Sequence, residues 1–89
     1  MAQSLDQRLH ATGCQSTRLR VLASRRAGDM ESLVSRIEKL WKIVQGDNAR
    51  EAAFDAICES WYLSETREDE EALRLLKADI SRLENKFGR

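Results

Sequence analysis

The chain has 89 residues, 42% of them hydrophobic, and its fifteen basic and fifteen acidic side chains give a formal net charge of zero. A chain of this length forms at most one domain with a small core, and small cores often need a partner, a metal or disulfides. The charge balance argues against a dedicated nucleic-acid-binding domain, and no apolar run is long enough to span a bilayer. We therefore expect a soluble, cytoplasmic protein with no membrane partner.

The chain contains no proline, and its β-branched residues never form the alternating pattern that is typical of strands, which predicts an all-α fold. Residues 1–14 combine low hydrophobicity with Gly13, and we expect them to form a flexible basic N-terminal arm. Residues 15–89 should then form a single helical domain. We expect a small antiparallel helical bundle or helical hairpin with three main helices.

Glycine and capping residues divide the domain into its expected helices. In chain order, we expect a short helix near 15–26 and amphipathic helices at 30–45, 48–62 and 65–87. Gly28–Asp29 and Gly46–Asp47 each pair a residue suited to a helix end with one suited to the next helix start. The acidic run at 68–71 should lie at the positive end of the last helix dipole.

Two of these helices carry matching apolar seams, with gaps of three and four residues. Each seam covers about two heptads, fewer than a free-standing coiled coil needs, so the two should pack together in one bundle. The last helix would span roughly 35 Å and the helix at 30–45 about 24 Å, which leaves one end uncovered. From this overhang we predict a homo-oligomer or a helical protein partner. The expected contact residues on the last helix are Leu76, Ile80, Leu83 and Phe87.

Tyr62 is a further predicted contact residue. It follows Trp61 directly, and adjacent side chains on a helix point about 100° apart. One neighbouring helix cannot bury both rings, so we expect Tyr62 to lie at a surface or a contact.

The charges are unevenly distributed along the chain. Residues 1–27 contain five arginines and one aspartate, whereas residues 47–71 contain nine acidic and two basic side chains. Phosphate contact requires only positive charge and reach, which makes the arginines of the helix near 15–26 candidate phosphate contacts. These are Arg18, Arg20, Arg25 and Arg26. Two other interpretations remain: a helix that caps the bundle with its arginines in solvent, or a basic segment that folds against the acidic middle.

No residue pattern predicts catalysis, a cofactor or a metal. His10 and Cys14 are four residues apart and Cys58 is distant, but the paired spacing of a zinc site is absent. Two cysteines are too few for a secreted disulfide scaffold, so we expect reduced thiols, with one long-range disulfide as the alternative.

We therefore expect that the protein is not an enzyme and binds no cofactor. The architecture favours a small helical protein–protein interaction module, an adaptor, chaperone or assembly factor that acts through its amphipathic seams. The alternative hypothesis is a nucleic-acid-associated regulator that uses the arginine-rich segment, and a structural subunit of a larger assembly is the third.

Overall fold

The computed structural model describes residues 4–14, 16–60 and 66–87, and within these ranges the chain is all-α, with five helices and no strand. This confirms the predicted all-α class. The expected arrangement of three main helices after a flexible arm is corrected, because a helix also forms at Leu5–Ala11 and the helix at Asn48–Cys58 is nearly as short as the one at Thr17–Arg25. The helices are α1 (Leu5–Ala11), α2 (Thr17–Arg25), α3 (Ala27–Val44), α4 (Asn48–Cys58) and α5 (Asp69–Phe87).

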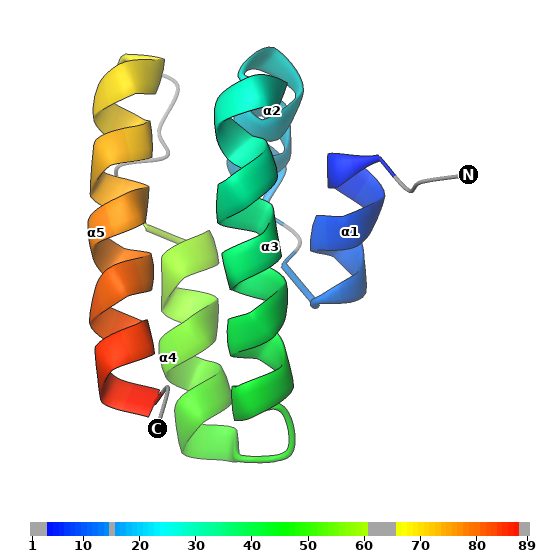
Figure 1. Cartoon of the computed structure of the whole chain (residues 1–89), viewed down its shortest axis with the longest axis vertical. Helices are drawn as coiled ribbons and strands as arrows, with labels where there is room; N and C mark the ends of the chain where they lie inside the picture. Colours follow the sequence, from blue (N-terminus) through cyan, green and yellow to red (C-terminus); the bar gives the residue numbers. More distant parts are fainter. Residues whose placement is uncertain (1–3, 15, 61–65, 88–89) are drawn as a thin grey trace.

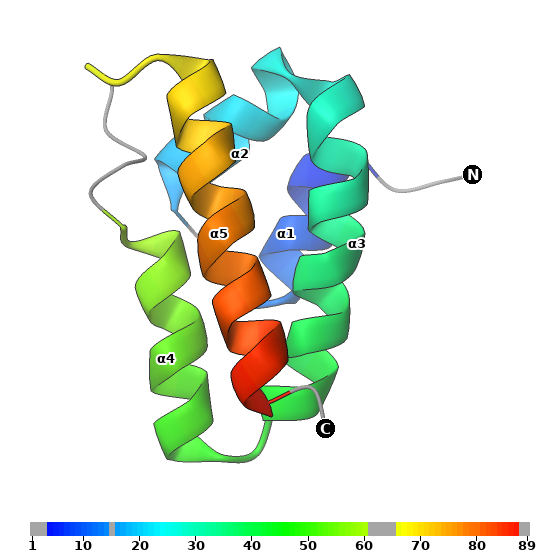
Figure 2. The ribbon, with the colours of Figure 1, turned by 60° about the vertical axis from the view of Figure 1, so that its left-hand side comes forward.

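Helices α3, α4 and α5 run in alternating directions, and α1 packs on the side of α3 away from α5 (Figure 1). Helix α4 has only 11 residues, against 18 in α3 and 19 in α5. Figure 2 shows α4 beside the lower part of α5 and α2 behind its upper part. Two short helices therefore share the role that one long helix would have in a simple bundle.

Helix α3 supplies the largest share of the core and contacts the other four helices. Its predicted seam is buried, and so is the seam of α5 from Leu73 to Leu83. Leu19 and Leu22 from α2 and Phe54 from α4 complete the same cluster. The expected packing of two similar seams in one bundle is therefore confirmed.

The overhang expected at the end of α5 is absent. Gly28 was expected to separate two helices, but it lies inside α3, which begins at Ala27. Helix α5 begins at Asp69, four residues later than expected, and its acidic first turn lies at the positive end of the dipole as predicted. The two long helices therefore have nearly equal lengths, and the length argument for a partner no longer holds.

The turn between α3 and α4 forms as the sequence predicts. Gly46 adopts a positive φ of 90°, a conformation that glycine tolerates without a steric penalty. Asp47 is the N-cap of α4, and its carboxylate accepts a hydrogen bond from the Arg50 amide at 3.1 Å. This turn reverses the chain and sets α4 antiparallel to α3.

Helix α1 lies within the range expected to be a flexible arm. The Ser4 hydroxyl accepts a hydrogen bond from the Gln7 amide, and the Gln7 side chain accepts one from the Ser4 amide, which is a capping box. Leu9 is fully buried in the common core. Low average hydrophobicity concealed this helix, because its docking depends on one buried leucine, a capping box and the contacts of Arg8 with α3.

A disulfide joins Cys14, between α1 and α2, to Cys58, the last residue of α4. The Cα atoms are 5.8 Å apart, and both residues are buried. The expectation of reduced thiols is therefore corrected, and the alternative of one long-range disulfide holds. The bond ties the N-terminal pair of helices to α4 across a sequence separation of 44 residues.

Replacing Leu9 by alanine tests whether α1 is an integral part of the fold. We expect the free energy of unfolding, measured by urea denaturation, to fall by about 2 to 5 kcal/mol, because the change leaves a cavity in the core. Val21→Ala is the control, since Val21 is 43% exposed, and it should change stability by no more than about 0.5 kcal/mol. Equal effects of the two changes would show that residues 1–14 behave as a flexible arm.

Replacing both cysteines by alanine should lower the free energy of unfolding by about 2 to 4 kcal/mol, because the disulfide restricts the unfolded chain over a long loop. The comparison is made without reductant, and wild-type protein unfolded in the presence of a phosphine reductant should lose a similar amount. Unchanged stability in both experiments would contradict a structural role for the bond.

Candidate functional site

Three of the four predicted phosphate-contact arginines form ion pairs inside the chain. Arg20 on α2 pairs with Asp6 on α1, and Arg25 reaches Asp69 at the start of α5 at 2.9 Å. Arg26 pairs with Asp29 at 2.8 Å within the first turn of α3. The fourth, Arg18, is exposed on α2 and also takes part in an interaction. The four arginines do not converge on one acceptor site.

A fifth arginine, which the sequence analysis did not single out, makes the most extensive contacts. Arg8 on α1 donates two hydrogen bonds to Glu38, at 2.7 and 3.1 Å, and one to Glu31 at 2.9 Å. It also donates to the Ser35 hydroxyl at 3.0 Å. These hydrogen bonds hold the pKa of Glu38 below its usual value. Glu31, Ser35 and Glu38 are spaced four and three residues apart and therefore share one helix face. This spacing was the sequence signal for a surface that could bind an arginine.

A matching contact joins α3 to α5. Arg36 donates two hydrogen bonds to Glu84, at 2.6 and 3.0 Å, and one to the Ser81 hydroxyl at 3.0 Å. This bidentate contact lowers the pKa of Glu84 and raises that of Arg36. Arg8 and Arg36 thus hold α3 to a different neighbour on each side.

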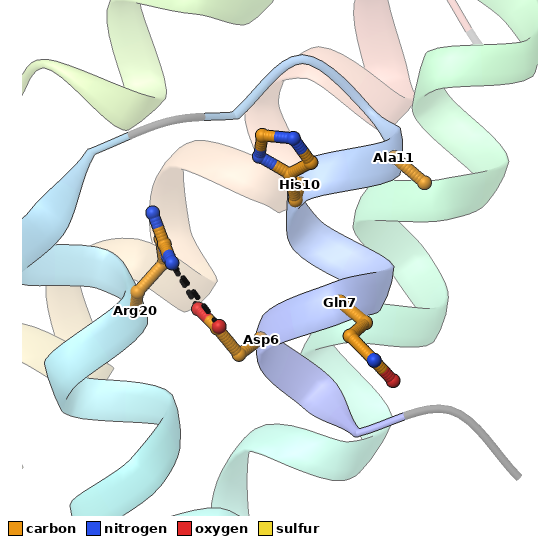
Figure 3. Close-up of a pocket in the computed structure, with 5 residues that line it drawn as sticks. All are labelled: Asp6, Gln7, His10, Ala11 and Arg20. Carbon is orange, nitrogen blue, oxygen red and sulfur yellow. Dashed lines mark hydrogen bonds and ion pairs between the residues drawn. The ribbon is translucent and has the colours of Figure 1, made fainter.

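Figure 3 shows the surface hollow between α1 and α2, where Arg20 and Asp6 face each other and Gln7 points away from them. The hollow is open and has a volume of about 440 Å³. Hydrogen bonds from Arg20 lower the pKa of Asp6, so each of these groups already satisfies the other.

His10 lines the hollow, but Cys14, its suggested metal-binding companion, is held in the disulfide. Among the described residues, no three His, Cys, Asp or Glu side chains converge as metal ligands would.

The predicted partner-binding residues have different environments. Leu76, Ile80 and Leu83 are buried in the core and at most 1% exposed, so they stabilise the chain's own fold. Phe87 is partly buried at the end of α5, with the Arg50 guanidinium 5.3 Å from its ring centre. Tyr62 lies outside the described residues.

The end of the bundle at which α3 and α5 finish and α4 begins (Figure 1) is called the distal end. Three large apolar side chains there are incompletely buried: Ile43 is 40% exposed, and Trp41 and Phe87 are partly buried. The Trp41 ring packs on Phe54 of α4, with ring centres 5.5 Å apart. Ile43 was missed because it lies off the apolar seam of α3, and no local sequence pattern showed that it would be exposed.

None of the helices in the described part of the chain has the length and apolar composition to cross a membrane. No family model matches the sequence, and neither the curated proteins nor the solved structures include a significant match. The functional argument therefore depends on the chain's own geometry.

The ion pairs predict how stability depends on pH. The pKa values of Glu38 and Glu84 are lowered from 4.5 in the folded state, so the unfolded state takes up protons first as the pH falls. The stabilisation is complete well above pH 4.5 and should be lost progressively below it. Urea denaturation between pH 3 and pH 7 measures the slope, and Glu38→Gln should make it shallower. An unchanged slope in this variant would contradict the Arg8–Glu38 contact in solution.

Proposed function

We propose that this chain is a small helical protein–protein interaction module, an adaptor, chaperone or assembly factor that binds protein and catalyses no reaction. The observation that carries the proposal is that three large apolar side chains, Trp41, Ile43 and Phe87, are incompletely buried at the same end of the bundle. When a partner covers exposed apolar side chains, the removal of their surface from water stabilises the complex.

The location of the proposed contact differs from the one inferred from the amphipathic seams. Most of each seam is buried inside the chain, and the equal lengths of α3 and α5 remove the overhang. Phe87 is the predicted partner-binding residue of α5 that remains partly exposed, and it belongs to the distal end. Self-association and binding of another protein are both consistent with this surface.

The nucleic-acid hypothesis and the cytoplasmic location stay predictions. The internal ion pairs of Arg20, Arg25 and Arg26 weigh against phosphate binding, since a phosphate would have to compete with a carboxylate already in place. The Cys14–Cys58 disulfide weighs against the cytoplasm, because disulfides persist mainly in oxidising compartments.

A pair of matched substitutions tests the proposed function. Ile43→Lys should reduce self-association, measured by sedimentation, or recovery of a partner from the native host, because it places a charge in the contact. Val21→Lys is the control, since Val21 is equally exposed but lies on α2. Both variants should keep the wild-type helical content and melting temperature. Phe87 is less suitable for this test because its ring also packs against the core.

A strictly monomeric wild type that recovers no host protein would contradict the proposed function. Equal loss of binding in Ile43→Lys and Val21→Lys would contradict the assignment of the contact to the distal end.

A further inference from the structure

The flank of α3 that faces α1 is only partly covered. Helix α1 ends at Ala11, and Figure 1 shows that α3 continues well beyond that point. A hollow of about 400 Å³ lies where this cover ends. It is called the Trp41 groove, and its lining includes Ala11, Thr12, Glu38, Lys39, Trp41 and Lys42.

The lining of the groove supplies a large apolar side chain on a rigid support. Trp41 is partly buried, and its ring rests on Phe54, which is 1% exposed. A half-buried tryptophan held by the core can bury an apolar side chain of a ligand without losing much conformational freedom of its own.

The charged side chains that line the groove differ in whether they form an ion pair. Glu38 is occupied by two hydrogen bonds from Arg8. Lys39 and Lys42 are exposed, and neither forms an ion pair with a described residue. Lys42 lowers the pKa of Glu38 less than Arg8 does, and Lys39 lowers the pKa of Glu84 less than Arg36 does, so each lysine lies near a carboxylate that an arginine already binds. The groove therefore presents two cations whose charges no ion pair neutralises.

We propose that the Trp41 groove binds an acidic peptide segment of a partner protein, which places an apolar side chain on Trp41 and its carboxylates near Lys39 and Lys42. Charge complementarity selects this occupant, since an acidic segment would neutralise both lysines. The inference rests on the proposed function and adds to it the chemical class of the partner and a groove that shares Trp41 with the distal end but does not include Ile43.

A nucleic-acid strand fits the same groove less well. Binding to a strand depends on many phosphate contacts, whereas this groove offers two uncommitted cations beside the carboxylate of Glu38.

Peptide selection with the full, disulfide-bonded chain tests the proposal. A randomised library of 12-residue peptides displayed on phage is selected on the immobilised protein, and Kd values of synthetic selected peptides are measured by fluorescence anisotropy. The expected peptides carry Asp or Glu next to Leu, Ile or Phe. Their Kd should rise about tenfold in the Lys39→Gln/Lys42→Gln double variant, because two exposed charge contacts are lost. It should also rise with salt.

Two controls fix the location of binding. Lys77→Gln removes an exposed lysine on α5 that lies outside the groove, and it should leave Kd unchanged. In a Trp61→Phe background Trp41 is the remaining tryptophan, since the chain has two, and its fluorescence should change when the peptide binds.

Selected peptides without acidic residues, or an equal Kd for wild type and the lysine double variant, would overturn the inference. Tighter binding of a 20-residue oligothymidylate, with displacement of the peptide, would also overturn it. A host partner that is lost in Ile43→Lys but retained by the lysine double variant would refute the groove alone and leave the proposed function standing.

Discussion

The disulfide between Cys14 and Cys58 is the constraint on which the arrangement of the short helices depends. Helix α4 is too short to accompany α3 and α5 along their whole length, and α2 packs on α3 near the end where α3 begins (Figure 1). Cys58 ends α4 and Cys14 lies just before α2, so the covalent bond joins the end of one short helix to the segment that leads into the other. In a chain of this size such a bond offsets the small core.

The interhelical ion pairs position the remaining elements. Arg8 links α1 to α3, Arg25 links α2 to α5, and Arg36 links α3 to α5. Arg8 and Arg36 each make a bidentate contact with one glutamate and reach a serine with the same guanidinium. Exposed ion pairs add little stability singly, but a planar, bidentate contact fixes direction. These arginines therefore set which face each helix turns to its neighbour, while the leucines supply most of the free energy.

The sequence predicted features that are local or that follow from helical periodicity. Asp47 caps α4 after Gly46, and the stripes around Ile37 and Ile80 are buried, because caps and periodicity act within a few residues. Helix α1 was within reach of the same reasoning, since Ser4 and Gln7 have the spacing of a capping box.

Other features could not be read from local sequence. The start of α3 at Ala27 shows tertiary packing overriding the weak helix propensity of Gly28. The disulfide and the partners of Arg8 and Arg36 join residues that are 23 or more positions apart. Such pairings depend on how the helices pack, and a single sequence carries no direct record of that. The distal end was missed for the same reason, because the exposure of Ile43 depends on where neighbouring helices stop.

The chemistry of the two basic residue types separates structure from proposed function. The ion pairs given above for the described residues all use an arginine. None of them uses Lys39, Lys42, Lys77 or Lys86. Guanidinium groups suit fixed bidentate contacts, whereas an ammonium group is a mobile point charge that keeps its hydration until a partner arrives. The net charge of zero over the whole chain therefore includes two kinds of cation, arginines that form ion pairs within the chain and lysines that form none with a described residue. The arginines Arg8, Arg20, Arg25, Arg26 and Arg36 are paired with carboxylates of the same chain, whereas Lys39 and Lys42 beside Trp41 are not paired with a described residue, which is why the proposed acidic segment is assigned to these lysines and not to the arginine-rich segment.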